Sequence, residues 1–494
     1  MNTLVQHLLN ELSYSPQNPV IFNSGLFLFL FVAFSAVYYL LRNRDTARIL
    51  FVTLFSYYFY YKSSGFYFLL LGLVTTTDFL LARGIDRHRD NRSLRRLLLT
   101  VSILIDMGFL AYFKYTNFFA GMVSQIIGNN FQPWDIFLPV GISFFTFQSL
   151  SYTIDVYRDR LKPLDSLLDY AFYVSFFPQL VAGPIVRARD FAPQIRRRLE
   201  VSETMVARGV FMIAIGLFKK AVISDYISLN FVDRIFDNPS LYSGFENLLG
   251  LYSYSLQIYC DFSGYSDMAI GLALLLGFHF PDNFNAPFKA QSMTDFWHRW
   301  HISLSSWIRD YVYISMGGNR RGKVMTYVNL VGSMLLCGLW HGASWNFVVW
   351  GGIHGLLLAA HKFLRQNILH HDKHYQSTGW KRVAAVFLTF QAVAFMFMIF
   401  RMQTWEGCGV MLSQIFTNFH PELVGEVLAS YRYILLLVAF GFVSHFVPDR
   451  LCSLSVCALK RGGLVLNVLV ITVIIFIVIQ IKSSQIQPFI YFQF

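Results

Sequence analysis

Long apolar stretches alternate with short polar connections along almost the whole chain. The first stretch, residues 25–41, carries no charge over 17 positions, which is close to the shortest α-helix that spans about 30 Å of hydrocarbon. Further apolar runs follow at 49–61, 65–82, 97–113, 135–156, 166–186, 207–224, 246–280, 325–346, 347–364, 383–400, 431–447 and 464–481. The pattern predicts an all-α polytopic membrane protein with about a dozen transmembrane or re-entrant segments.

Two of these runs are poor candidates for a simple crossing. Pro178 and Pro184 interrupt the run at 166–186, while the run at 246–280 is too long for one span and contains Asp261. Broken backbone at membrane depth must be surrounded by protein or water. We therefore expect kinked or re-entrant elements at both places, packed inside the bundle.

The composition supports a membrane protein and excludes other classes. Hydrophobic residues make up 55% of the chain and charged residues 14%, whereas soluble domains average about 25% charged residues. Five scattered cysteines predict no disulfide framework. Residues 1–20 lack the features of a secretory signal, so we expect a short N-terminal segment and one membrane-embedded domain over 1–494.

The formal net charge of +12 comes mainly from basic residues in short connections. Arginine and lysine concentrate at 42–48, 83–96, 187–198 and 320–323. Basic residues confined to short loops are typical of the cytoplasmic side of membrane proteins, which places the N-terminus outside. Nucleic-acid binding would require a basic face on a folded domain, and we do not predict it.

The region at 281–323 is the least membrane-like part of the chain and reads as an interfacial amphipathic helix. At 100° per residue, one stripe collects the apolar residues Phe296, Trp297, Trp300, Leu304, Trp307, Ile308 and Tyr311. His301 lies at the edge of this stripe and is expected to face the protein interior. His298 is expected to be more exposed.

A second histidine, His341, occurs inside the uncharged stretch 335–355, between the predicted helices of 325–364. An ionisable group at membrane depth is costly unless it has a partner, so the default interpretation is functional. Gly338 and Gly342 form a small-xxx-small pair that lets a neighbouring helix approach. Trp340 and Trp345 are expected to wall the same region, and His354 is expected to be structural.

A neutral imidazole can take the proton of an alcohol that attacks a carbonyl group. This chemistry suits acyl transfer in a site shielded from water. The H-x4-D signature of glycerolipid acyltransferases and the G-x-S-x-G nucleophile elbow do not occur in the sequence. Cys337, four residues before His341, leaves an acyl-cysteine route open.

Two further clusters have both a structural and a chemical interpretation. Asp261, Ser263 and Asp267 lie within an apolar segment, where the carboxylates could orient a catalytic histidine or pair with Arg299 or Arg309. The second cluster could ligate zinc, but a charged connector between two apolar spans explains it more simply, and we predict no metal site. It consists of His370, His371, Asp372 and His374.

Six motifs together resemble the membrane-bound O-acyltransferase family, in particular its alginate O-acetylation branch. They are PVGISFFTFQSLSYTIDVYR (139–158), FFPQLVAGPIVR (176–187), QIYCDFSGYSDMAIG (257–271), FWHRWHISLSSWIRDYVYISMGGNR (296–320), GLWHGASWNFVVWGGIHG (338–355) and QPFIYFQF (487–494). The nearby D-alanyl transfer branch shares most of them.

The resemblance implies a ring of about 11–13 helices around a thin centre crossed by a tunnel. It implies that His341 is catalytic and that His301 is the second polar site residue. The tunnel-lining candidates are Trp300, Trp340, Trp345, Asp261, Ser263 and Asp267.

The resemblance also implies a substrate and a partner. The donor would be acetyl-CoA or another acyl thioester, with no tightly bound cofactor. The partner would be a periplasmic SGNH-type acetyltransferase, and the location the bacterial inner membrane. Three alternatives stay open: D-alanyl or other acyl transfer to a cell-wall polymer, a non-enzymatic transporter, and a structural scaffold. The absence of internal repeats of the kind found in many transporters disfavours the second.

Overall fold

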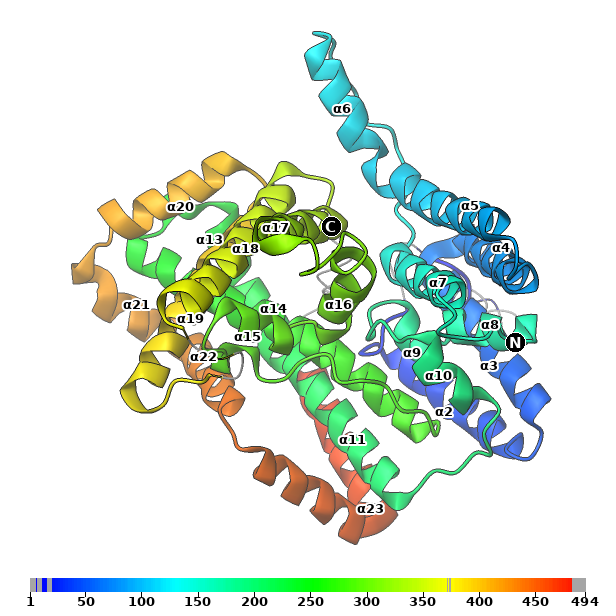
Figure 1. Cartoon of the computed structure of the whole chain (residues 1–494). Helices are drawn as coiled ribbons and strands as arrows, with labels where there is room; N and C mark the ends of the chain where they lie inside the picture. The colour runs from blue at the N-terminus through cyan, green and yellow to red at the C-terminus, as the bar shows by residue number, and fades with distance from the viewer. Residues whose placement is uncertain (1–5, 7–10, 16–19, 371, 373–374, 482–494) are drawn as a thin grey trace. The chain divides into compact units, whose positions relative to one another are not determined.

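The structure is a computed structural model that describes residues 6, 11–15, 20–370, 372 and 375–481. All regular structure in this part of the chain is helical (Figure 1). Six described helices are long and apolar enough to cross a membrane, or seven if the bent pair Pro421–Ser430 and Arg432–His445 is one span. The all-α polytopic prediction is therefore confirmed. The number is below the expected dozen because the stretch Asp45–Arg87 is counted once although it holds two predicted runs, and because other runs form shorter helices such as Gly25–Leu40.

The helices group into two compact units. The first comprises Met1–Gly209 and Met268–Pro281, and the second comprises Val210–Asp267 and Asp282–Phe494. Helices of the first unit are α2 (Gly25–Leu40), α3 (Asp45–Ser64), α4 (Phe68–Arg87), α5 (Arg92–Leu110), α6 (Thr116–Ile126), α7 (Ile142–Tyr157), α8 (Leu167–Ser175), α9 (Phe177–Leu180) and α10 (Ala188–Ile195). Two helices contribute residues to both units: α11 (Glu203–Leu217) and α14 (Gly244–Leu275).

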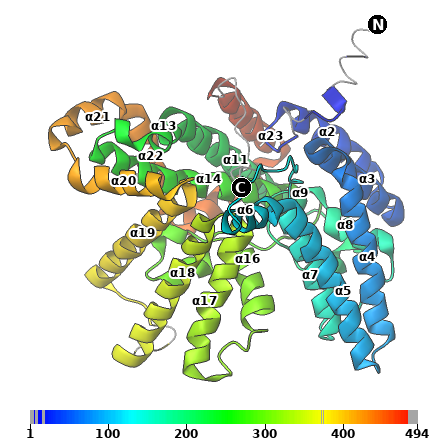
Figure 2. The same ribbon diagram turned by 90° about the horizontal axis from the view of Figure 1, so that it is seen from above.

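In the first unit the chain reverses at Gly65, which has a φ of +59° and separates α3 from α4. Because α4 folds back on α3, a Cβ on Gly72 would lie 3.7 Å from the ring of Tyr57. The predicted runs 49–61 and 65–82 are thus two helices. The following helix, α5, lies beside α4, as Figures 1 and 2 both show.

The basic connections of the first unit meet at one end of these helices. Since α3 and α4 are antiparallel, the start of α3 and the end of α4 lie at the same end. There Arg48 donates a hydrogen bond to the carbonyl of Arg197 (3.3 Å), and Arg83 donates one to the carbonyl of Asp165 (3.3 Å). This grouping agrees with the prediction that these connections share one side of the membrane.

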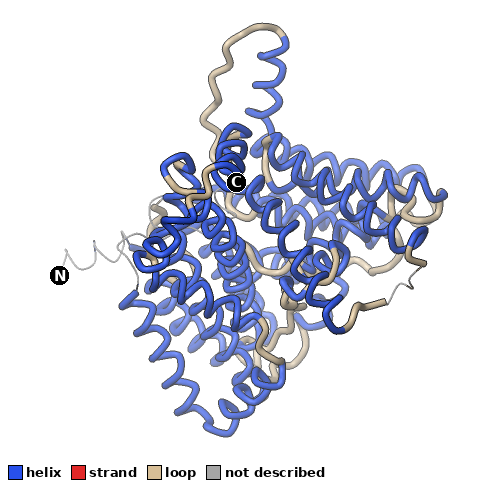
Figure 3. The backbone as a smooth tube through the Cα atoms, turned by 90° about the vertical axis from the view of Figure 1, so that its left-hand side faces the viewer, coloured by secondary structure: helices blue, strands red, loops and turns tan. Residues whose placement is uncertain are grey.

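Prolines and glycines set the helix boundaries in two of the predicted apolar runs. The run at 166–186 is broken as predicted, because α8 ends at Ser175 and α9 starts again at Phe177. The run at 135–156 becomes helical only at Ile142, after a long loop seen at the top of Figure 3. Pro139, which has no amide hydrogen, and Gly141, with a φ of +74°, delay this helix.

The second unit contains the hairpin that carries His341. Here α17 (Gly322–His341) and α18 (Trp345–Phe363) run beside one another (Figures 1 and 2). Other α-helices of at least five residues in this unit are α13 (Asp233–Asp237), α15 (Met293–Arg299), α16 (Ile302–Trp307), α19 (Gly379–Arg401), α20 (Trp405–Thr417), α21 (Val424–Ser430), α22 (Arg432–His445) and α23 (Asp449–Ile481). Short π-helical stretches include Phe218–Ser224 and Ile308–Tyr313.

Two long helices of the chain differ in continuity. α23 breaks at Gly463, which has a φ of +59°, so its apolar second half begins where the sequence predicts a span at 464–481. By contrast, α14 is one uninterrupted helix of 32 residues. The expectation of a kinked or re-entrant element at 246–280 is therefore wrong. Its buried carboxylates have lysine partners, so the backbone does not need to break around them.

Candidate functional site

His341 is the last residue of α17 and is almost completely buried. Its ring lies between three aromatic rings, with centroid distances of 4.9 Å to Trp340, 5.1 Å to Trp350 and 5.3 Å to Phe400. Trp350 comes from α18 and Phe400 from α19. Three neighbouring helices thus enclose the imidazole, as its predicted burial requires.

The structure corrects the expected role of Trp345. This residue starts α18 and leaves 53% of its surface exposed. Trp350, which lies five positions later on the same helix, contacts His341 instead. Trp350 could not be recognised from its place in the sequence, because it lies nine positions after His341 and on the following helix.

Glycines determine how closely α18 approaches α17. A Cβ on Gly338 would overlap the carbonyl oxygen of Phe347, and a Cβ on Gly351 would overlap that of Met334. Gly338 therefore has the predicted packing role. Gly342 also lets α18 approach, since a Cβ there would overlap the ring of Phe347, but it lies just past the end of α17 in an extended conformation.

His301 lies at a break between two short helices. α15 ends at Arg299, Trp300 is extended, and His301 has a left-handed backbone with a φ of 43°. The expected continuous amphipathic helix over 281–323 is therefore wrong. A neighbouring segment supplies the reason, because the Ile302 amide donates to the carbonyl of Asn283 (2.9 Å) instead of continuing the helix.

The predicted burial pattern of this region is nevertheless confirmed. All seven residues of the predicted apolar stripe are buried, and His298 is exposed. His301 is fully buried, with its ring centroid 4.6 Å from that of Phe262. Burial lowers the pKa of His301 to about 3, so the ring is neutral at physiological pH.

Asn283 determines which nitrogen of His301 carries the proton. The backbone N–H of Ser303 donates to the side-chain oxygen of Asn283 (3.2 Å), and the Asn283 amide nitrogen donates to Ser266 (3.1 Å). Both contacts fix the orientation of the amide, because a backbone N–H can only donate. His301 Nδ1, 3.2 Å from the same oxygen, must therefore be protonated. The lone pair of the ring is then on Nε2.

Trp340 brings the two histidines into one site. Its ring centroid lies 6.2 Å from that of His301 and 4.9 Å from that of His341. The two imidazoles come from positions 40 residues apart in the sequence and share one indole as a wall. His301, Trp340 and His341, three predicted site residues, are thus assembled together.

His354 has a structural environment. The indole N–H of Trp297 donates to His354 Nδ1 (3.3 Å), and the ring of Trp350 lies 4.5 Å away. An Nδ1 that accepts a hydrogen bond leaves the proton of the neutral ring on Nε2. His354 is fully buried among these rings.

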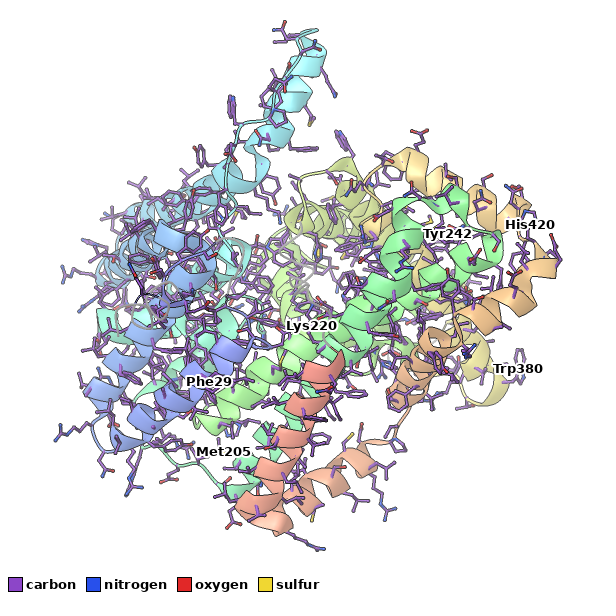
Figure 4. The ribbon with its side chains drawn as sticks, turned by 180° about the vertical axis from the view of Figure 1, so that it is seen from behind. Phe29, Met205, Lys220, Tyr242, Trp380 and His420 are labelled. Carbon is purple, nitrogen blue, oxygen red and sulfur yellow. The ribbon has the colours of Figure 1, made fainter. Side chains whose placement is uncertain are left out.

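The acidic cluster forms ion pairs with lysines. Asp261 pairs with Lys220, which also pairs with Asp225 (2.8 Å), and Asp267 pairs with Lys219 (2.7 Å). Figure 4 labels Lys220. Arg299 and Arg309 were expected as partners, but the structure places them elsewhere.

Arg299 pairs with Asp295 (2.8 Å), and Arg309 pairs with Asp310 (2.7 Å). Both arginines thus form an ion pair with an aspartate close in sequence. The expected pairing of Arg299 or Arg309 with Asp261 or Asp267 is therefore wrong. Ser263 is fully buried on α14. The signal that could have revealed the true pairing is the presence of two adjacent lysines inside the apolar run 207–224.

A cavity of about 730 Å³ lies in the second unit; its lining includes Ile302, next to His301, and Cys337, one helical turn before His341, but neither histidine itself. From α17 it is lined by Lys323, Thr326, Tyr327, Leu330, Ser333, Met334 and Cys337, among others. These positions follow the 3–4 residue spacing of one helix face, and the next positions on that face are Trp340 and His341. The lining extends over about 21 Å of helix from residue 323 to 337. It therefore leads towards His341.

All charged side chains among the described lining residues of this cavity are basic. Arg309, Lys323, Lys362 and Arg365 line it, and the described lining residues include no carboxylate. Its deep end is apolar, with Leu330, Met334 and Cys337. The cavity therefore offers cations to an anionic group and an apolar surface to an uncharged one.

The two remaining sequence features fall partly or wholly outside the described residues. Of the possible zinc cluster, His371 and His374 are not among them, and the described residues include no group of three or more His, Cys, Asp or Glu side chains placed to hold a metal. The closing motif at 487–494 also lies outside them.

These features define a class of protein: a multi-pass helical membrane protein with two buried imidazoles beside a basic cavity. The profile of the MBOAT, membrane-bound O-acyltransferase family, matches residues 97–403. The chain therefore belongs to the membrane-bound O-acyltransferase family, and it is an acyltransferase.

Several similar proteins are named as O-acetylases, O-acetyltransferases or D-alanyltransferases. The chain is 41% identical over 351 residues to the probable alginate O-acetylase AlgI of Azotobacter vinelandii, covering 70% of this chain and 69% of the relative. It is 37% identical over 339 residues to the peptidoglycan O-acetyltransferase of Helicobacter pylori, 63% of each chain. It is 32% identical over 285 residues to the teichoic acid D-alanyltransferase of Bacillus subtilis, covering 54% of this chain and 70% of the relative.

Proposed function

We propose that this acyltransferase transfers an acetyl group from a cytoplasmic thioester donor, such as acetyl-CoA, to a hydroxyl group of an acceptor. The acetyl group is finally carried by a cell-surface polysaccharide. The basic cavity that leads along α17 towards His341 is the observation that supports this proposal. The acceptor is an alginate-like or other surface glycan, reached through a periplasmic SGNH-type acetyltransferase. The protein acts in the bacterial inner membrane. The names of the O-acetylating relatives support this choice.

The position of the cavity fits a donor that arrives from the cytoplasm. The part of its lining that belongs to α17 begins at Gly322 and Lys323, directly after Arg320 and Arg321. This basic connection is cytoplasmic by the positive-inside rule. A volume of about 730 Å³ lies within the range of small-molecule sites. Phosphate groups of the donor would contact the cations, while the acyl arm would enter the apolar end.

In the proposed reaction, the acceptor oxygen attacks the thioester carbonyl carbon. The proton of the hydroxyl group passes to the imidazole of His341, a C–O bond forms and the C–S bond breaks. His341 then returns the proton to the leaving thiolate, so a free thiol and an ester result. His301, whose ring centroid lies 6.2 Å from that of Trp340, keeps its lone pair on Nε2 and positions the reacting groups. General-base catalysis of this kind contributes about 10²–10⁴-fold in rate.

The cavity also favours acetyl over D-alanyl transfer. A D-alanyl thioester carries an ammonium group at neutral pH, whereas an acetyl group is uncharged. Basic side chains line this cavity, and no carboxylate belongs to its described lining. An ammonium group would therefore meet like charges and an apolar end without a counter-ion.

The donor site can be tested by acetyl-CoA binding to the purified protein in nanodiscs. Lys323→Gln removes an exposed lining cation, and we expect the dissociation constant to rise about 3–10-fold, less at high salt. Arg320→Gln removes an exposed charge from the same connection outside the cavity lining and should leave binding unchanged. Equal effects of the two changes would reject the cavity as the donor site.

The acetyl group and its acceptor can be identified in cells. Mass spectrometry of surface glycans from cells with and without this gene should show an acetyl group lost from one glycan. Loss of a D-alanyl group instead would establish the alternative acyl group. An unchanged glycan pool would contradict the proposed function.

A further inference from the structure

A second cavity, of about 560 Å³, lies in the first unit. It is formed where the end of α2 and the start of α3 meet residues 194–205 and 276–279. None of its lining residues belongs to the histidine site or to the cavity beside it. It is therefore a separate feature, and its interpretation does not depend on the proposed function.

Three arginines give this cavity its charge. Arg48 is buried and held in place by an ion pair with Asp45 (3.0 Å) and a hydrogen bond to the carbonyl of Arg42 (3.1 Å). Arg197 and Arg198 line the same cavity with exposed side chains, and neither makes an ion pair with a described residue. Two guanidinium groups are thus available to a ligand.

Only one acidic side chain opposes these arginines. Glu200 is the single carboxylate among the described lining residues, and it is exposed. The formal charge of the lining is therefore positive even without a contribution from His279. Arginine presents planar pairs of N–H donors that match phosphate oxygens, so a phosphate group is the ligand that this charge pattern suits best.

Buried apolar side chains form part of the lining. They are those of Tyr38, Leu276 and Phe278. The Tyr38 hydroxyl donates to the carbonyl of Leu276 (2.6 Å), which ties α2 to the end of α14. The lining therefore combines buried apolar side chains with basic ones.

The outer face of α2 suggests how the rest of the ligand lies. Phe29, Val32 and Leu40 on this helix are 80%, 70% and 83% exposed, as expected for a surface in contact with lipid (Figure 4 labels Phe29). Leu40 is the last residue of α2, next to the basic connection at 42–48. An acyl chain along α2 would thus end near the arginines.

We infer that this cavity binds the phosphate group of an anionic membrane lipid, with Arg197 and Arg198 on the phosphate and the acyl chains along α2. Basic pockets at the cytoplasmic membrane surface suit such head groups. A soluble phosphate ester shares the same phosphate chemistry, but it would make no use of the exposed apolar face of α2. The volume is large enough for a glycerophosphate head group.

The test measures lipids retained by the full-length protein in native mass spectrometry. The protein is purified from nanodiscs that contain equal amounts of phosphatidylglycerol and phosphatidylcholine. We expect wild-type protein to retain phosphatidylglycerol about tenfold over phosphatidylcholine. The double variant Arg197→Gln with Arg198→Gln should lose most of this preference. Glu200→Gln, which removes the opposing charge, should increase it.

The matched control is Arg92→Gln with Arg96→Gln. These two arginines are also exposed, in the first turns of α5 in the first unit, but they do not line the cavity. They should leave the preference unchanged. Equal losses in the two double variants would reject a specific site, and so would an unchanged preference after loss of Arg197 and Arg198. Displacement by millimolar glycerol phosphate would show a site for soluble phosphate esters and overturn the lipid assignment.

Discussion

The side-chain oxygen of Asn283 lies 3.2 Å from Nδ1 of His301. The same oxygen accepts the backbone N–H of Ser303, so its identity as the oxygen is fixed and the histidine must donate. His301 is thereby held in one tautomer with its lone pair on Nε2. Asn283 is a positioning residue in this arrangement, since it acts through His301.

Asn283→Ala should reduce kcat at least about tenfold, and by up to the ~10⁴-fold that loss of the correct histidine tautomer costs, because His301 would no longer position the reacting groups. The substitution frees the imidazole to rotate and to exchange the proton between its nitrogens. Asn283→Asp keeps the accepting oxygen but adds a charge, which raises the pKa of His301. The pH–rate profile of this variant should therefore gain an ionisation that wild type lacks. Equal profiles for the two variants would show that Asn283 has only a structural role.

Burial of neutral His301 should make the protein less stable in acid. The pKa is about 3 in the folded protein and about 6.5 in an unfolded chain. The unfolded state therefore binds the proton first as pH falls, and the stabilisation present above pH 6.5 is lost progressively towards pH 3. In wild type the melting temperature should fall over this window more steeply than in His301→Gln. If the melting temperatures of wild type and His301→Gln fell in parallel with pH, the burial of a neutral His301 ring would be contradicted.

Close packing of α17 against α18 should be needed for activity. A methyl group at Gly351 would overlap the carbonyl oxygen of Met334 and push α18, with Trp350, away from His341. We expect Gly351→Ala to lower the melting temperature and to reduce acyl transfer at least tenfold. Gly409→Ala on α20 meets no atom within 4 Å and is the control. Wild-type behaviour of both variants would show that the helices can separate without effect.

Cys337 should be dispensable for catalysis. It lines the basic cavity one helical turn before His341, which is where an acyl-cysteine would have to form. In the proposed direct transfer the thiol only fills space, so Cys337→Ala should retain acyl transfer within about threefold. A stable acetyl adduct on Cys337, detected by mass spectrometry of the protein mixed with acetyl-CoA, would instead support a covalent route.

The membrane architecture could be predicted because it depends on the length of apolar runs. The boundary at 464, the break between α8 and α9 and the burial of His341 all follow from local sequence. The break at His301 could not be predicted. The helical spacing of 296–311 continues across it, and the helix is interrupted where it bonds to a distant segment. His301 Nδ1 and the Ile302 amide donate to Asn283, and the Asn285 amide donates to the carbonyl of Arg299.

Contacts between distant segments limited the prediction of the site. The nearest aromatic residues in sequence suggested Trp345, but the turn after His341 directs that side chain outwards and brings Trp350 inwards. Likewise, Asp261 and Asp267 pair with lysines more than 40 residues away. Partners of this kind depend on how helices pack, which periodicity along one helix does not show.

The most direct test of this account is acetyl transfer by His341→Ala, measured with isotope-labelled acetyl-CoA and the acetylated glycan fraction. His420→Ala, which changes an exposed histidine that does not line the cavity, is the control. We expect His341→Ala to be folded, to bind acetyl-CoA and to transfer less than about 1% of the wild-type label, while His420→Ala transfers label normally. Normal transfer by a folded His341→Ala protein would contradict the account.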